Sequence, residues 1–481
     1  MTDQTADRLF DVRRWSDHPE VNRCLTDLVE EIETQEGRVR KRVKAAPAFR
    51  AAVSALVLDL YVAWKANPEM HISVPLSSRD FADGKRYARL HFTYDTFKPA
   101  FDGLRKLGYF NITRGGFIDR ETGIGRVTRI IATKKLIDKL RSVPLVSINR
   151  DPGPEIIILK NEKKMAVAYE ATAFTRQAEA NLKSINHLLS QHWYDLDLTD
   201  DQFEELTLRM CIGHLEARQR KDNDVKPAGV DFSARSLHRI FNNGDWDQGG
   251  RFYGGWWQSI PSEYRRYITI DHKPTIEVDY SGMHPVMLYA EANAPMPGDP
   301  YDPAFVGAPN ASRALVKLTF NKLLNASGRI VPEDFDEATV GMSWKKFQDC
   351  IVNAHAPIRH RFKSGDGLRL QKKDAAIAEQ VMLRFLGMGY ACLPVHDSFV
   401  VHYALQDELE RIMQSEFEKV LGIRCPVKLG ERAPGPIRTG LVNDDIMEAI
   451  MSGNCSGFEM RWLEWRSMQD GRSAPTNRMS G

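Results

Sequence analysis

The stretch TIEVDYSGMHPVMLYA, residues 275–290, joins a short strand-like pattern to an apolar helix-like pattern. Ile276 and Val278 alternate with more polar residues, and this period of two predicts a short buried strand. The strand delivers Asp279 at its end, and an apolar helix follows. An aspartate at a strand end is usually a cap or a turn residue. Whether Asp279 has a further function therefore depends on other segments of the chain.

Two later segments carry charged residues at defined places. The segment SRALVKLTFNKLLNAS predicts a helix on which Arg313 and Lys317, four positions apart, share one face. The segment GYACLPVHDSFVVHY predicts a β-hairpin with Asp397 at its turn. Taken singly, an Arg/Lys pair is usually a solvated helix face, and a His-Asp pair usually has no function.

The order of these three segments suits one chemistry. Two carboxylates on adjacent strand ends can hold two Mg²⁺ ions about 4 Å apart, which activate an attacking hydroxyl and stabilise a leaving oxygen. Two cations on a helix can bind the triphosphate of a nucleotide, where negative charge builds in the transition state. The sequence therefore predicts nucleotidyl transfer with Mg²⁺, or Mn²⁺ in its place.

The three segments resemble the polymerase motifs of family A DNA polymerases and of the single-subunit phage and mitochondrial RNA polymerases. The resemblance implies that Asp279 and Asp397 are the catalytic metal ligands, with His396 near the primer end. It places Arg313 and Lys317 at the triphosphate. The implied fold is an α+β right-hand polymerase, with an antiparallel palm sheet and with helical fingers and thumb.

Two further segments extend the resemblance over about residues 230–432. GGRFYGGWWQSIP resembles the family segment that precedes the first motif, which implies that Arg251 and Gln258 contact template or primer. LQKKDAAIAEQVMLRFL resembles the helix before the third motif and implies the same role for Gln371.

The chain also departs from the family pattern. His284 occupies the position of a glutamate that excludes ribonucleotides, and Asn325-Ala326 replaces the usual Tyr-Gly at the end of the fingers helix. HDSF is typical of the RNA polymerases, whereas DYS is typical of the DNA enzymes. The choice between dNTPs and rNTPs therefore stays open. The nucleotide-binding positions implied are Arg313, Lys317, Asn321, Asn325, His284 and Tyr280.

The net charge of +2 conceals a basic block in the N-terminal part of the chain. Residues 38–141 contain 22 Lys and Arg against 9 Asp and Glu. Two helix patterns followed by a β-hairpin pattern predict a winged-helix-like α/β domain, whose second helix would enter a DNA major groove. Arg114, Arg126 and Arg129 on the hairpin would meet phosphates. A winged helix that only binds protein is the alternative.

The length of 481 residues indicates two to four domains. We expect no membrane span and no secretory signal, and the six scattered cysteines favour a reducing, cytoplasmic compartment. The predicted organisation is a helical lead-in, the basic winged-helix-like domain, a linker with a thumb-like helical region, the palm with compact fingers, and a C-terminal helix with a disordered tail, at residues 1–36, 37–143, 144–230, 231–436 and 437–481.

The leading hypothesis is a template-directed nucleic-acid polymerase, foremost a DNA polymerase for a phage or mobile-element replicon. Its partners would be a template–primer duplex, duplex DNA at the winged helix, dNTPs or rNTPs, and replication proteins, without a membrane. One alternative is an RNA-synthesising polymerase or primase of the single-subunit type. Another is a non-enzymatic DNA-binding initiator or regulator with a degenerate polymerase domain.

Overall fold

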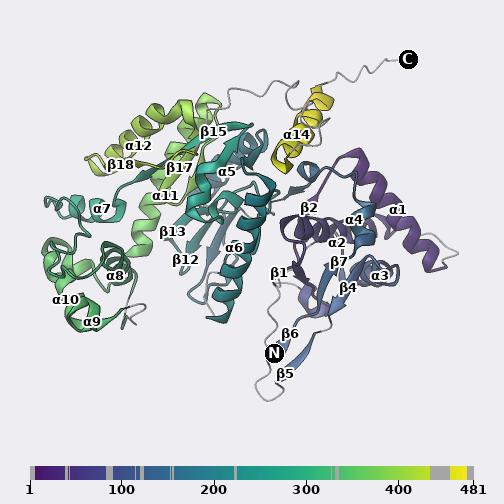
Figure 1. Cartoon of the computed structure of the whole chain (residues 1–481), viewed down its shortest axis with the longest axis horizontal. Helices are drawn as coiled ribbons and strands as arrows, with labels where there is room; N and C mark the ends of the chain where they lie inside the picture. Colours follow the sequence, from purple (N-terminus) through teal and green to yellow (C-terminus); the bar gives the residue numbers. More distant parts are fainter. Residues whose placement is uncertain are drawn as a thin grey trace.

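The computed structural model of the chain has two regions, each with its own hydrophobic core (Figure 1). We call them the N-terminal region, residues 6–148, and the second region, which follows it. The structure describes residues 6–37, 42, 44–82, 90–113, 115–119, 124–151, 153, 156–220, 225–326, 328–330, 335–433 and 456–473. At 116–119, 124–126 and 471–473 it describes the backbone alone.

A four-stranded sheet with helices against it forms the N-terminal region. Its strand order is β1-β3-β7-β4, with a further hairpin, β5–β6, beyond β4 and β7 (Figure 1). The strands are β1 (Asp7–Leu9), β3 (His71–Ser73), β4 (Phe110–Thr113), β5 (Gly116–Asp119), β6 (Ile124–Arg126) and β7 (Arg129–Ala132). The helices are α1 (Pro19–Gln35), α2 (Ala46–Ala66), α3 (Tyr94–Lys106) and α4 (Lys134–Lys139).

Helix α2 is the centre of the N-terminal core because apolar residues occupy nearly its whole circumference. Among the described residues it is the one helix long and apolar enough to cross a membrane by length and composition. The expectation that the chain has no membrane span stays a prediction. Of the most apolar window of α2, 67% is buried inside the protein, as in the core helix of a globular domain.

The local elements expected for a winged helix are present. Thr93 caps α3 in a reciprocal capping box with Thr96, and Gly108 follows the helix with a φ of 76° that suits glycine. Strands β4 and β7 pair antiparallel beside the β5–β6 hairpin. The predicted helix, helix and hairpin are thus confirmed, whereas the winged-helix assignment stays a prediction.

Two sheets and a set of long helices build the second region. One sheet has the order β10-β9-β12-β13, and the other has the order β11-β14-β15-β17-β16 with β18 also paired to β15. The strands of the first sheet are β9 (Ile157–Lys160), β10 (Ala166–Val167), β12 (His238–Asn242) and β13 (Asp245–Tyr253). Those of the second are β11 (Tyr194–Leu196), β14 (Ile268–Ile270), β15 (Lys273–Tyr280), β16 (Leu393–Val395), β17 (Ser398–His402) and β18 (Val427–Leu429).

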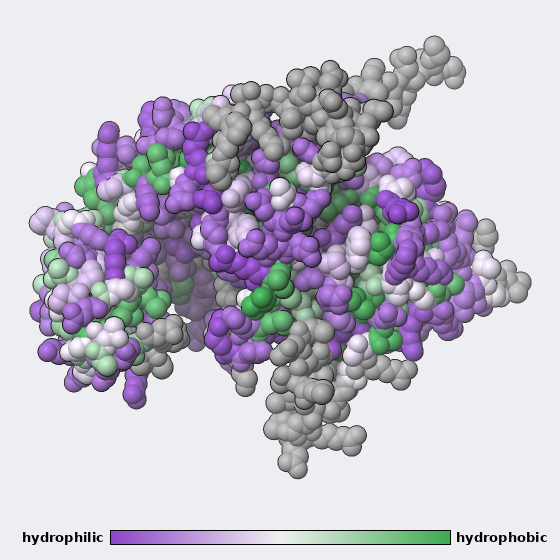
Figure 2. Space-filling model, in the orientation of Figure 1, coloured by the Kyte–Doolittle hydropathy of each residue, from purple (hydrophilic) through white to green (hydrophobic). Residues whose placement is uncertain are grey.

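The helices of the second region fall into two groups. Three of them, α8 (Arg313–Asn325), α9 (Glu337–Val340) and α10 (Trp344–Ala354), form a lobe at the left of Figure 1. Figure 2 shows the surface hollowed between this lobe and the rest of the second region. The remaining helices are α5 (Ala173–Ser190), α6 (Asp200–Gln219), α7 (Met283–Glu291), α11 (Gly367–Met388), α12 (Gln406–Leu421) and α14 (Gly457–Ser473).

The junction between the two regions is held by ion pairs and by the last described helix. Arg14 is buried and bonds both Asp59 of α2, at 2.6 Å, and Asp231, also at 2.6 Å. Helix α14 lies beside both regions (Figure 1), where Arg461 bonds the buried Asp195 and Trp465 stacks on Trp193. These contacts hold the N-terminal region against the second region.

Candidate active site

Asp279 and Asp397 lie next to each other at the ends of two paired strands. In the antiparallel register of β15 and β17, Asp279 is the partner of Ser398, the residue after Asp397. The backbone N–H of Tyr280 donates to the carbonyl of Asp397 at 3.2 Å. The predicted strand and hairpin are therefore confirmed, and they bring together the two carboxylates that lie far apart in the sequence.

The electrostatics of this pair favour a cation. Burial, then the charges of Asp397 and Glu277, raise the pKa of Asp279 to about 7, while Lys317 and Arg265 act in the opposite direction. Burial and the same two aspartates also raise the pKa of the Cys425 thiol to about 12. Two crowded carboxylates repel each other, and a divalent ion removes that repulsion.

The donor chemistry fits Mg²⁺, which prefers carboxylate oxygens completed by water and substrate oxygens. Asp279 and Asp397 would hold the ion or ions. Within the part of the chain that the structure describes, no group of three or more His, Cys, Asp or Glu has the geometry of a metal cage. Water would therefore complete the coordination of an ion at this site, and substrate oxygens would replace some of that water during the reaction.

Helix α8 brings two cations toward the carboxylates. Ser312 caps the helix by accepting a hydrogen bond from the N–H of Leu315, so the cations stand on its first two turns. The charges of Arg313 and Lys317 lie 5.4 and 6.0 Å from the ring centre of the buried Tyr301. Lys317 is close enough to lower the pKa of Asp279 against the effect of burial. The structure therefore places Lys317 within electrostatic range of Asp279, and it places Arg313 on the same helix face against Tyr301 and Asp299.

Arg313 already has a partner. Its Nε and Nη2 donate to the carboxylate of Asp299 at 2.6 and 3.0 Å, and its side chain is 57% exposed. An ion pair this exposed contributes little to stability, so the arginine can exchange Asp299 for another anion at small cost.

A three-residue cluster connects β13, α7 and α11. The Asp374 carboxylate, 1% exposed, accepts from Arg251 Nε at 3.0 Å and lies 3.0 Å from His284 Nε2. Arg251 Nη2 also bonds Asp374, so the arginine holds the carboxylate with two nitrogens. The structure thus brings together two predicted site residues, Arg251 and His284, through a third residue that the sequence did not single out.

The other residues predicted at template or primer lie around the β16–β17 turn or on α11. Gln258 Nε2 donates to the carbonyls of Phe252 and Pro394, both at 3.0 Å, so its amide holds the turn. His396 is exposed with a φ of 58°, and its ring lies 6.2 Å from that of Tyr253. Gln371 is half-buried on α11.

Two predicted nucleotide-binding side chains, those of Tyr280 and Asn325, have other surroundings. The side chain of Tyr280 does not line the site, because it is buried and its hydroxyl donates to the carbonyl of Met413 on α12 at 2.6 Å. Asn325 is exposed at the end of α8, and its Nδ2 donates to the carbonyl of Asn321 at 2.8 Å. The side chain of Asn325 also packs against Gly367 at the start of α11, so closely that a Cβ at this glycine would collide with Asn325 Oδ1.

Of the three arginines expected to contact phosphates in the N-terminal region, the structure describes the side chain of one, Arg129. Arg114 lies outside the described residues, and Arg126 is described by its backbone in β6. Arg129 is buried, with Nη1 lying 3.8 Å from Asp7. Its side chain faces the protein interior, so a phosphate contact would require it to leave Asp7.

The sequence around Asp374 contains a pattern that indicates a buried carboxylate. Leu370, Ile377 and Val381 form the buried face of α11, and Asp374 lies on that same face. A charge on the apolar face of an amphipathic helix requires a buried partner. Asp299, which holds Arg313, gave no comparable signal because it stands in a loop rich in proline, glycine and alanine, where no periodic pattern sets a buried face.

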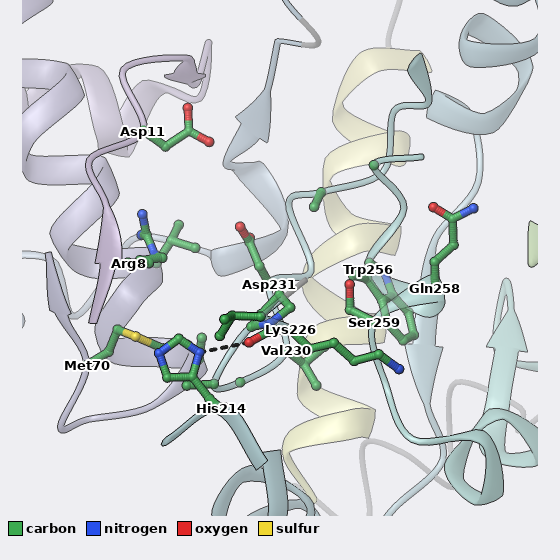
Figure 3. Close-up of a pocket in the computed structure, with 18 of the residues that line it drawn as sticks. Arg8, Asp11, Met70, His214, Lys226, Val230, Asp231, Trp256, Gln258 and Ser259 are labelled. Carbon is green, nitrogen blue, oxygen red and sulfur yellow. Dashed lines mark hydrogen bonds between the residues drawn. The ribbon is translucent and has the colours of Figure 1, made fainter. Parts of the chain in front are cut away.

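A separate pocket of about 780 Å³ lies between the two regions (Figure 3). Arg8 and Asp11 line it from one side, and Gln258 and Ser259 from the other. His214 Nδ1 bonds the carbonyl of Lys226 at 2.8 Å at its base. The described arginines that line it are ion-paired to aspartates, at Arg8–Asp59, Arg14–Asp231, Arg150–Asp11 and Arg218–Asp7.

Comparison with known proteins gives a distant structural similarity. No family model matches the chain, and no curated protein is similar to it. Among solved structures, the chain is similar to the POL domain of Pol1 from M. smegmatis, determined in complex with DNA primer-template and dNTP. The similarity covers 61% of this chain and 72% of that chain, at 12% sequence identity and a TM-score of 0.36.

Proposed function

We propose that the protein is a template-directed nucleic-acid polymerase that transfers nucleotides with the help of divalent ions. The observation that carries the proposal is the juxtaposition of Asp279 and Asp397 across β15 and β17, with Lys317 of α8 within electrostatic range of Asp279. The order of the motifs in the sequence, which resembles family A polymerases, supports the same reaction class.

Each residue of the site has a distinct part in this reaction. Asp279 and Asp397 would hold Mg²⁺, which supplies activation of the attacking hydroxyl and neutralisation of the leaving phosphate. Lys317 stands beside Asp279 and would bind the triphosphate where it approaches the carboxylates. Arg313 would exchange Asp299 for the triphosphate, because a phosphate carries more charge and offers the same forked geometry.

The basic N-terminal region supports a role on nucleic acid. Its excess of Lys and Arg over residues 38–141 suits a polyanion, and neutralising phosphates makes such binding dependent on salt. We propose that this region binds duplex DNA and directs DNA synthesis to a phage or mobile-element replicon. Binding of labelled duplex by residues 1–481 should weaken steeply between low and physiological salt.

The test is primer extension with the full chain, a labelled primer–template, Mg²⁺ and dNTPs. The wild-type protein should extend the primer, and Asp397→Ala should not. Asp302→Ala changes an aspartate of the loop before α8 that the site does not use, and it should extend the primer like the wild type. Full incorporation by Asp397→Ala would refute the site.

A second candidate, RNA synthesis with or without a primer, is favoured by His284. His284 carries an imidazole, which bonds Asp374, in place of a carboxylate. The position therefore lacks the glutamate that excludes ribonucleotides in the enzymes the sequence resembles. Supplying rNTPs and dNTPs separately, each with and without primer, distinguishes the two. A strong preference for dNTPs eliminates RNA synthesis, and any metal-dependent incorporation eliminates a purely non-enzymatic initiator.

A further inference from the structure

Asp374 is a buried carboxylate with two polar neighbours, both of which come from strands and helices that border the reaction centre. Arg251 lies near the end of β13, and His284 stands on the first turn of α7, five residues after Asp279. Asp374 comes from α11, which packs along β13. The carboxylate therefore restrains one cationic and one imidazole side chain at the edge of the site.

Arg251 has a second carboxylate within electrostatic range. Burial opposes its charge, but Asp374 and, more weakly, Asp397 raise the pKa of its guanidinium. The same end of β13 is in contact with the β16–β17 turn, since Tyr253 lies against His396 and Gln258 donates to the carbonyl of Pro394. Arg251 thus binds the carboxylate of Asp374 and lies within electrostatic range of the carboxylate of Asp397.

We propose that Asp374 is a positioning residue that holds Arg251 away from Asp397, and so keeps both carboxylates of the site available to a divalent cation. The inference rests on the proposed function and deepens it. Without the Asp374 charge, Arg251 is a half-buried cation, and the remaining carboxylate within its electrostatic range is Asp397. A charge that is largely removed from water is unfavourable without a partner of opposite sign, so the guanidinium would shift toward Asp397.

His284 strengthens this arrangement. Its Nε2 lies 3.0 Å from Asp374 Oδ2 and 3.5 Å from Arg251 Nη2, so it closes the cluster on the side of α7. The groups that face Arg251 are therefore Asp374, His284, His396 and Asp397. Of these, only the two aspartates carry negative charge, and the balance between them decides where the guanidinium rests.

The test measures cation binding directly. Mn²⁺ is titrated into the full chain and followed by electron paramagnetic resonance of the free ion, without nucleotide or DNA. Asp374→Asn keeps the shape and removes the charge, and we expect about a 10- to 100-fold weaker Mn²⁺ affinity, as for other groups that orient metal ligands. The double variant Asp374→Asn/Arg251→Gln should recover most of the wild-type affinity, because the competing cation is gone.

Glu379→Gln is the matched control. Glu379 lies on the same helix and binds Arg239, a buried arginine of β12, at 2.8 Å. This variant loses an equivalent ion pair at a distance from the carboxylates, so its Mn²⁺ affinity should match the wild type. If Asp374→Asn does not fold, Asp374→Leu replaces it, and Arg251→Gln alone should leave Mn²⁺ affinity equal to or higher than that of the wild type.

The outcomes separate the two ideas. Wild-type affinity in folded Asp374→Asn, or no recovery in the double variant, would overturn the inference while wild-type primer extension stands. Weakened Mn²⁺ binding in Arg251→Gln alone would also overturn it. A wild-type chain that neither binds Mn²⁺ nor extends a primer would overturn the proposed function, and the inference with it.

Discussion

Two groups of aspartates, each wholly or partly buried, have opposite electrostatic surroundings in this molecule. At the junction, burial raises the pKa of Asp231, but Arg14 outweighs it and lowers that pKa to about 2. At the strand ends, burial and Asp397 together raise the pKa of Asp279 to about 7. At the junction, Asp59 and Asp231 are paired with arginine. At the strand ends, Asp279 and Asp397 lie side by side. Uncompensated charge of this kind is typical of sites that bind something.

The largest expected effect is on activity. Asp279→Asn should reduce nucleotide incorporation by roughly 10³-fold or more, because a neutral amide cannot hold the divalent ion or its charge. Single-turnover primer extension at saturating dNTP measures the loss. Asp59→Asn, at the junction, serves as the contrasting variant, and its folded fraction should incorporate at the wild-type rate.

The reverse contrast appears in stability. Asp59 has no exposed side-chain surface and is bonded by both Arg8 and Arg14, so Asp59→Ala leaves two arginines without their shared partner. We expect a loss of about 3–5 kcal/mol in the free energy of unfolding, measured by urea denaturation. Asp138→Ala removes an exposed pair with Lys134 and should change stability by less than about 0.5 kcal/mol. Equal losses in the two variants would contradict the comparison.

The stability of the site itself should depend on pH. A folded pKa of about 7, raised from 3.8, means that the folded state binds the proton more tightly than the unfolded state. Asp279 therefore contributes stability below pH 4, and this is lost as pH rises from about 4 to 7. Asp279→Asn should consequently be more stable than the wild type at pH 8 without metal, by at most about 4 kcal/mol.

Thermal unfolding of both proteins at pH 5 and pH 8, in the presence of a chelator, measures this difference. The advantage of the variant should shrink at pH 5, where Asp279 holds its proton. Adding Mg²⁺ at pH 8 should stabilise the wild type alone, since only an intact site binds the ion. An unchanged difference between the two pH values would show that Asp279 is not crowded by Asp397.

The smallest expected effect concerns the substrate. Lys317→Ala should raise the KM for the incoming nucleotide by about 10- to 50-fold, because it removes one charge-assisted contact to the triphosphate. Lys345→Ala removes an exposed lysine of α10 in the same lobe and should leave KM unchanged. Steady-state incorporation against nucleotide concentration distinguishes the two. If the wild type and Lys317→Ala had the same KM, the role of Lys317 would be to pack against the ring of Tyr301 and not to bind the nucleotide.

Local patterns allowed much of the fold and the pairing of the site to be predicted. Alternation at Ile276 and Val278 indicated β15, and the His396-Asp397 pair was correctly placed at a turn between strands. The ends of α3, at Thr93 and Gly108, are local features of the same kind, because capping depends on a few neighbouring residues. Each of these features depends on residues close together in the chain.

Partners distant in the sequence could not be predicted in the same way. Asp374 meets Arg251 across 123 residues, and Arg14 meets Asp231 across 217. No local pattern indicates that Tyr280 turns its hydroxyl toward α12, or that Arg129 lies against Asp7. Burial and ion pairing are properties of the assembled fold, and they decide which of the predicted side chains reach the site.

Helix α14 has a consequence for the order of folding. It follows in the sequence every residue that it touches, including Asp195, Trp193 and the 3₁₀ turn Leu145–Ser147, against which Glu464 is packed. On the ribosome, both cores would emerge before this helix exists. The two regions would therefore first meet through the Arg14–Asp231 ion pair, and α14 would add its contacts to both regions only when residues 457–473 leave the exit tunnel.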